Sequence, residues 1–223
     1  KQKTAYEIPK RDWSSDVCSS DLKTFKEKCL DFYKTKTINR IKNFLNKNNI
    51  EDKEEYINGI LVPKIEDLLS LVEYSKLSND VPTGYHGDFI LENILFGNKD
   101  FILLDWRQDF SGEILYGDKN YDLSKLNHNL TVNHDIIYKN LYKIKFLENN
   151  IECDILVKKN LLDCKEALKR YCDKNNINFS NIEILTSLIW LNMSPLHEHP
   201  IDKFLYYFGK YNLFLNTKGK QGD

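Results

Sequence analysis

The chain lacks several features that would place it in a protein class at once. Only 1 methionine and 9 glycines occur among 223 residues, and the glycines do not gather into a phosphate-binding loop. No apolar run approaches the length of a membrane span, and no signal peptide precedes the first expected helix. Basic residues (32) and acidic residues (33) nearly cancel, so the charge favours neither nucleic acid nor an anionic membrane as a partner. We therefore expect a cytoplasmic protein without a membrane span.

The cysteines do not form a recognisable metal or disulfide framework. Their number is odd, and no two have the close CxxC spacing of a zinc or redox site; they are Cys18, Cys29, Cys153, Cys164 and Cys172. We interpret them as reduced thiols that pack as small hydrophobic side chains.

One segment does not match its surroundings. Residues 11–22, RDWSSDVCSSDL, repeat Ser-Ser-Asp and lack the Lys, Asn and Ile bias of the rest of the chain. This pattern is typical of translated sequencing-adapter sequence, and a polar linker is the alternative. We exclude the segment from the functional argument. Residues 23–223 are long enough for one domain with a real core, and no second boundary is evident.

Helical periodicity dominates the coherent part of the chain. Apolar residues recur at helical spacing over 24–46, which predicts a long amphipathic helix. Pro63 is expected at the first position of a second helix that ends near Leu77. A third helix is expected over about 161–175. A fourth is expected to be capped by Ser180 or Asn181 and to end at Pro195. A last helix is expected to follow Pro200.

A short block between residues 85 and 105 predicts a β-hairpin. The apolar runs Ile94-Leu95-Phe96 and Phe101-Ile102-Leu103-Leu104 flank the turn sequence Gly-Asn-Lys-Asp. A glycine-containing loop then leads to Asp122, which we expect to cap a helix over 123–130. A second small hairpin is expected over 142–155. The predicted fold class is α+β, mainly helical with short hairpins.

Polar residues stand at both outer ends of the first hairpin. Asp88 and Asn93 flank the loop before it, and Asp105 ends its second strand, so strand pairing would bring the three together. Carboxylate and amide oxygens suit Mg²⁺, which also binds substrate phosphates. Phosphoryl transfer needs a carboxylate at the acceptor hydroxyl and an Asn and an Asp at the metal. We assign Asp88 as base, Asn93 and Asp105 as metal ligands, and His86 as a support of the loop.

These residues carry a family resemblance. His86-Gly87-Asp88-Phe89-Ile90-Leu91-Glu92-Asn93 resembles the HGDxxxxN catalytic loop of the aminoglycoside phosphotransferase and choline kinase family, and Leu103-Leu104-Asp105-Trp106 resembles its metal-binding segment. More loosely, residues 117–123 resemble the family's GDxxYDLA segment, and residues 191–197 are similar to members found near bacterial capsule and lipopolysaccharide genes. The resemblance implies a protein-kinase-like C-terminal lobe that uses ATP and Mg²⁺.

The resemblance is incomplete. Family members place a nucleotide-binding lobe before the catalytic loop, but no glycine-rich loop or strand lysine precedes His86 in this chain. We expect that lobe to be largely absent, with residues 1–10 as a remnant of the inter-lobe linker. A truncated chain of this kind is expected to bind ATP poorly.

Several residues are candidates for the acceptor side. Trp106, Arg107 and Asp109 follow the metal-binding aspartate, although Arg107 could equally serve a structural ion pair, and His197 could lie near the acceptor. The aromatic residues Trp190, Tyr206 and Tyr207 could form a cage for a quaternary ammonium, but aromatic residues on apolar helix faces usually belong to a core.

The implied reaction is transfer of the γ-phosphate of ATP to a hydroxyl of a small molecule. A sugar, an amino alcohol or choline destined for a bacterial surface polysaccharide is favoured, and an aminoglycoside is the less favoured acceptor. A protein kinase is disfavoured because Gly87 stands where those enzymes usually carry Arg. A non-catalytic pseudokinase-like binding module remains an alternative from a different class.

Overall fold

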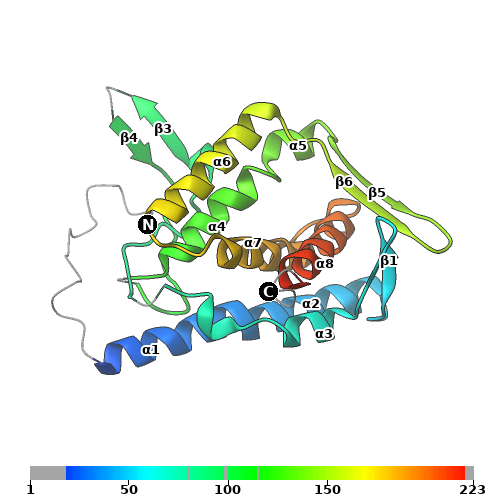
Figure 1. Ribbon diagram of the computed structural model, residues 1–223, viewed down its shortest axis with the longest axis horizontal. Helices are drawn as coiled ribbons and strands as arrows, with labels where there is room; N and C mark the ends of the chain where they lie inside the picture. The colour runs from blue at the N-terminus through cyan, green and yellow to red at the C-terminus, as the bar shows by residue number, and fades with distance from the viewer. Residues whose placement is uncertain (1–18, 80, 98–99, 115, 219–223) are drawn as a thin grey trace.

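The computed structural model describes residues 19–79, 81–97, 100–114 and 116–218, which form a mainly helical α+β structure (Figure 1). The expected linker remnant, residues 1–10, lies outside the described residues, as does most of segment 11–22. The described part of the chain contains no helix with the length and apolar character needed to cross a bilayer. The cysteines within it are free thiols, of which Cys29, Cys153 and Cys172 are buried.

A long helical rod opens the described structure and confirms the first predicted helix. It consists of α1 (Ser19–Leu30), a π-helical turn (Asp31–Thr35) and α2 (Lys36–Asn48). Its apolar stripe is buried as the periodicity predicts, with Phe25, Tyr33 and Phe44 almost fully enclosed. The wider π turn changes which side chains face inward, a feature often found at functional sites.

The second predicted helix is shorter than expected. Instead of running from Pro63 to Leu77, α3 spans Ile65–Ser70, and a single 3₁₀ turn (Tyr74–Lys76) follows. The helix begins after Pro63 because the Asp52 carboxylate accepts the backbone N–H groups of Ile65 and Glu66, at 2.8 and 3.1 Å. These are among the N–H groups that a helix start leaves without a partner.

Both predicted hairpins are present. β3 (Ile94–Gly97) pairs with β4 (Asp100–Leu103), and Figure 1 shows this hairpin projecting from the helical body. β5 (Tyr142–Phe146) pairs with β6 (Ile151–Ile155). A third hairpin, β1 (Glu55–Ile57) with β2 (Ile60–Val62), was not predicted. Its turn is Asn58-Gly59, with φ of 50° and 76°, and this dipeptide is a strong hairpin signal. β1 also pairs in parallel with β6, which gives a four-stranded sheet of order β2-β1-β6-β5.

The remaining helices confirm the expected order, except that a short helix over His134–Tyr138 was not predicted and the expected caps were wrong. They are α4 (Lys119–Asn129), α5 (His134–Tyr138), α6 (Lys159–Lys174), α7 (Phe179–Met193), a 3₁₀ turn (Ser194–Leu196) and α8 (Ile201–Lys218). Asn178, rather than Ser180 or Asn181, caps α7. Asp118, rather than Asp122, caps α4, because that helix begins four residues earlier than predicted and Asp122 falls within its first turn.

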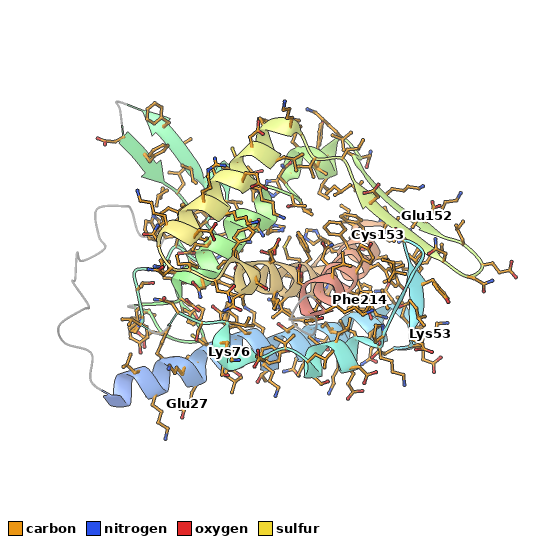
Figure 2. The ribbon with its side chains drawn as sticks, viewed as in Figure 1. Glu27, Lys53, Lys76, Glu152, Cys153 and Phe214 are labelled. Carbon is orange, nitrogen blue, oxygen red and sulfur yellow. The ribbon has the colours of Figure 1, made fainter. Side chains whose placement is uncertain are left out.

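The core lies around α7, which packs against α8, α4 and α2, and around α8, which also packs against α3 and the four-stranded sheet (Figure 2). Trp190, Tyr206 and Tyr207 are buried there. The Trp190 Nε1 donates to His128 Nδ1, and the Tyr206 ring stacks on Phe44. These three aromatic side chains are therefore core residues and do not form an open cage for a cation.

Candidate functional site

The loop that carries Asp88 depends on a glycine. Gly87 has a φ of 81°, in the left-handed region that residues with a side chain rarely adopt. A Cβ at this position would lie 2.5 Å from Cβ of Arg107 and 2.6 Å from the ring of Tyr85. No side chain fits there without displacing both neighbours, so an Arg at residue 87 is incompatible with this loop.

Asp122 holds the same loop from α4. Its two carboxylate oxygens accept the backbone N–H groups of His86 and Gly87, at 2.8 and 2.7 Å. The predicted cap of its own helix is thus a fixing point for the loop 36 residues earlier. Burial raises the pKa of Asp122 to about 7, although both N–H donors act in the opposite direction.

The strand ends of the first hairpin meet beside Asp88, as the motif predicts. Leu104 N–H donates to the Asn93 carbonyl at 2.8 Å, and Arg107 N–H donates to the His86 carbonyl, also at 2.8 Å. The Asn93 amide Nδ2 donates to the Asp88 carbonyl at 2.9 Å. These bonds tie the loop, Asn93 and the segment at Asp105 into one unit.

Asp105 stands at a strained position of that unit. Its φ is 53°, which is uncommon for a residue with a side chain, and such outliers gather at functional sites. The residue is exposed, whereas Asn93 is partly exposed. Solvent therefore reaches both predicted metal ligands.

The Asp88 carboxylate contacts two cations. Oδ1 lies 2.8 Å from Nζ of Lys125, and Oδ2 lies 3.3 Å from a guanidinium nitrogen of Arg107. Burial raises the pKa of Asp88, but Lys125 and then Arg107 outweigh burial and leave it below its ordinary value. The carboxylate is therefore ionised at neutral pH. The sequence analysis missed Lys125, although it lies three residues after Asp122 and so shares its face of α4.

His86 and Trp106 support the loop from inside. Asp88 N–H donates to Nδ1 of His86 at 3.2 Å, and the His86 ring lies 4.7 Å from the Trp106 ring. Burial lowers the pKa of His86, which agrees with a neutral ring that accepts a hydrogen bond. Trp106 in turn donates from Nε1 to the Leu103 carbonyl, so both side chains pack as supports of the site.

The oxygen donors match the preference of Mg²⁺. Among the described residues, no hydrogen bond to Oδ1 of Asn93 is recorded, and Asp105 adds a carboxylate. The described residues contain no cluster of three or more His, Cys, Asp or Glu side chains that could hold a metal. An all-protein cage is therefore absent from this part, and the donor set fits an ion that keeps waters and binds phosphate oxygens.

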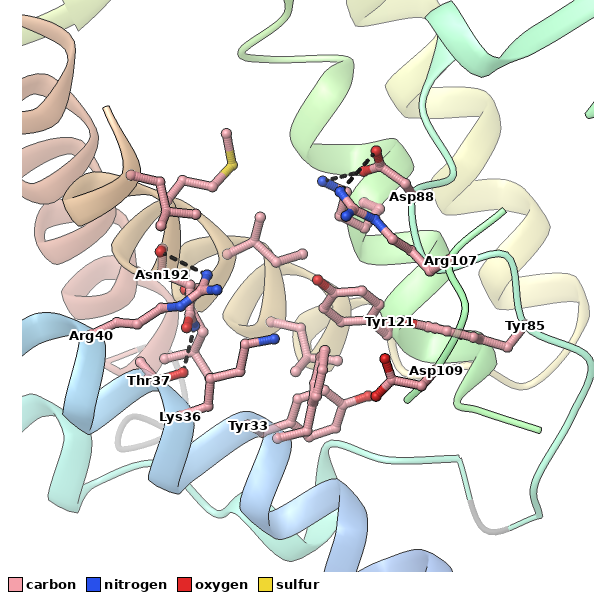
Figure 3. A pocket seen from close by; sticks show the side chains of 18 residues that line it. Tyr33, Lys36, Thr37, Arg40, Tyr85, Asp88, Arg107, Asp109, Tyr121 and Asn192 are labelled. Atoms are coloured by element: carbon pink, nitrogen blue, oxygen red, sulfur yellow. Dashed lines mark hydrogen bonds and ion pairs between the residues drawn. The ribbon is translucent and has the colours of Figure 1, made fainter. Parts of the chain in front are cut away.

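A cavity of about 300 Å³ opens beside Asp88 (Figure 3). Arg107 and Asp109, two of the residues predicted for the acceptor side, line it. Among the described residues, its lining includes neither Trp106 nor His197, although Leu196, the residue before His197, does line it. Further polar lining residues come from α2, α4 and α7. Tyr121 and Asn192 belong to the segments 117–123 and 191–197 that carry the looser family resemblance, whereas Lys36, Arg40 and Lys125 were not predicted.

Comparisons with known proteins add no assignment. The chain matches no protein-family model, and comparisons with curated proteins and with solved structures found no match. The resemblance of residues 86–123 to a kinase family therefore remains a prediction.

Proposed function

We propose that this chain carries the catalytic lobe of a small-molecule kinase, which transfers the γ-phosphate of ATP to a hydroxyl group. The supporting observation is the position of Asp88. Its ionised carboxylate borders the cavity, and its main chain is bonded to Asn93, beside the segment that carries Asp105. One residue thus stands between a pocket and a set of oxygen donors.

In this proposal the acceptor lies in the cavity with its hydroxyl at Asp88. The carboxylate orients the hydroxyl and takes its proton as the oxygen attacks the γ-phosphorus. The O–H bond breaks, a new O–P bond forms, and the bond to the bridging oxygen of ADP breaks. Arg107 and Lys125, both in contact with Asp88, would hold the carboxylate and offset negative charge on the phosphoryl group.

The nucleotide would occupy the hairpin side of the loop. Asn93 and Asp105 would hold Mg²⁺, which when bound neutralises charge on the nucleotide phosphates. The exposed side chains of Leu95, Ile102 and Leu104 would offer an apolar surface to the adenine ring of the nucleotide. The chain has no glycine-rich loop before His86, so we expect its own affinity for ATP to be weak.

Transfer from radiolabelled ATP to a panel of sugars and amino alcohols, by the full-length product of the gene, tests the proposal. Asp88→Asn should lower turnover by a factor of about 10² to 10⁴ and leave nucleotide affinity nearly unchanged. Asp105→Asn should weaken Mg²⁺-dependent nucleotide binding. Asp100→Asn, the same change on an exposed strand residue of β4, is the matched control.

Turnover that is unchanged in Asp88→Asn would remove this residue from the role of base. Nucleotide binding without transfer to any acceptor would favour a non-catalytic binding module instead.

A further inference from the structure

The cavity beside Asp88 carries an excess of positive charge. Four basic side chains line it, against two carboxylates, those of Asp88 and Asp109. Figure 3 shows two of the basic residues, Lys36 and Arg40, on the α2 side of the cavity, across from Asp88 and Arg107. The positive charge therefore extends well beyond the two cations that pair with Asp88.

The two cations on α2 have no acidic partner in the described part of the chain. Arg40 donates from Nη1 to the Asn192 carbonyl at 3.0 Å, and the Lys36 ammonium stands 3.7 Å from the centroid of the Phe32 ring. No described carboxylate lies within ion-pair distance of either. The nearby Asp109 instead accepts the backbone N–H of Gly112.

Mutual repulsion marks this group of cations. The pKa of Lys36 is lowered to about 8, chiefly by burial and then by the charges of Arg40 and Arg107. The carboxylates of Asp109 and Asp31 raise this pKa, but they do not offset the lowering. Burial also lowers the pKa of Arg40. Like charges held close together cost free energy, which Asp109 and Asp31 offset only in part and which a bound anion would recover.

We infer that the acceptor is itself an anion, a hydroxyl-bearing molecule whose phosphate monoester or carboxylate binds Lys36 and Arg40 while its hydroxyl lies at Asp88. The placement of the hydroxyl at Asp88 rests on the proposed function, whereas the binding of an anion at Lys36 and Arg40 does not. Lysine and arginine are the side chains that proteins use for phosphate and carboxylate groups. The volume of the cavity, about 300 Å³, suits a molecule of the size of a sugar phosphate.

The same lining disfavours cationic acceptors. An aminoglycoside or choline would bring positive charge into a pocket that already has a net excess of it. The aromatic rings of the lining are engaged as well: the Lys36 ammonium covers Phe32, while Tyr33 and Tyr85 pack against Phe110.

Binding to the 223-residue chain, measured by titration calorimetry at pH 7 without nucleotide, tests the inference. The probes are glucose, glucosamine, choline, glucuronate and glucose 6-phosphate. Glucuronate and glucose 6-phosphate should bind about tenfold or more tightly than glucose, and the tighter of the two identifies the anion. Glucosamine and choline should bind no better than glucose.

Substitutions locate the site. Lys36→Met and Arg40→Met should each weaken binding of the preferred anion by about tenfold or more. Lys36→Arg, which keeps the charge, should retain the affinity and shows that a loss in Lys36→Met is not a folding defect. Lys42→Met, on an exposed position of the same helix, is the control that should change nothing.

Equal or tighter binding of glucosamine or choline, absence of anion binding, or unchanged affinity in both methionine variants would overturn the inference. Its failure is separable from that of the proposed function. If the protein binds the anion but transfers no phosphate, the anion site stands and the proposed kinase activity is contradicted. If it transfers phosphate to a neutral or cationic acceptor, the kinase activity stands and the anion site is contradicted.

Discussion

Two lysine–carboxylate pairs in this protein have almost the same geometry and very different surroundings. Lys125 lies 2.8 Å from Asp88, and Lys210 lies 2.7 Å from Glu55. The Lys125 side chain is 11% exposed and lines the cavity, together with the carboxylate it contacts. The Lys210 side chain is 0% exposed and also donates to the Lys53 carbonyl at 2.9 Å.

The difference separates a structural pair from a site. Lys210 connects α8 to the strand β1 and has fixed partners on both sides, so nothing further has to bind there. Asp88 contacts a second cation, Arg107, and faces a space large enough for a small molecule. A buried ion pair alone is therefore a poor guide to function, and the second cation at Asp88, beside a cavity lined by two further cations, is the more informative feature.

The largest expected effect is a difference in the stability lost when the lysine of each pair is replaced. Lys210→Met removes the cation in contact with Glu55, whose side chain is only 14% exposed, and should lower the free energy of unfolding by about 3–5 kcal/mol. Lys125→Met should lower it by only about 1–2 kcal/mol, because Asp88 keeps Arg107 as a second cation. Urea unfolding followed by circular dichroism measures both. Equal losses would show that Arg107 does not compensate Asp88 for the loss of Lys125.

A second, smaller effect concerns how the loop of Asp88 is held. Each oxygen of Asp122 accepts one backbone N–H, so Asp122→Asn places an amide NH₂ against a buried N–H donor. The variant should lose about 1–3 kcal/mol of unfolding free energy.

Asp118→Asn is the matched control on the same helix. One oxygen of Asp118, Oδ1, accepts both the Asn79 and the Asn120 N–H, and the other faces the Tyr33 hydroxyl at 2.6 Å. An Asn keeps both backbone bonds through its Oδ1 and replaces the bond that the Tyr33 hydroxyl donates to Oδ2 by one that its NH₂ donates to the Tyr33 oxygen. This variant should be at least as stable as the wild type at pH 7. A loss equal to that of Asp122→Asn would contradict the proposed hydrogen-bond pattern.

The pH dependence of stability sharpens the contrast between Asp88 and the enclosed carboxylates. Burial raises the pKa of Asp118 to about 6, well above the unfolded value of 3.8. The protonated form is thus favoured in the folded state, and its contribution is present below pH 3.8 and lost as the pH rises through 6. Asp118→Asn should remove a decline of about 1–2 kcal/mol between pH 4 and 7. A wild-type profile that rises with pH and is unchanged in the variant would contradict this assignment.

The local part of the site could be predicted from the sequence. Asp88, Asn93 and the segment at Asp105 lie within one loop and one hairpin, so pairing of Ile94 with Leu103 is sufficient to bring them together. The long first helix was predictable for a similar reason, since its apolar stripe repeats at helical spacing. In both cases the information lies within about twenty residues.

The rest of the site depends on packing between distant segments. Asp122 was assigned as a cap because helix starts favour Asp, and only the packing of α4 against the loop shows that it bonds to His86 and Gly87. Arg40 meets the Asn192 carbonyl across 152 residues. Periodicity predicts which face of a helix is buried but not which segment covers it, so the basic wall of the cavity was not foreseeable.

The smallest expected effect is a pH dependence of anion binding at Lys36. With a pKa of about 8, Lys36 is mostly charged at pH 7 and mostly neutral at pH 9, whereas a sugar phosphate stays dianionic throughout because its second pKa is about 6. The affinity for glucose 6-phosphate should therefore fall about threefold or more from pH 7 to 9, less than full loss of the charge would give because the bound anion raises the pKa of Lys36. Lys36→Arg, with a side chain that stays charged, should abolish the decline. An equal decline in that variant would assign the titration to another group, and a flat wild-type profile would place the anion away from Lys36.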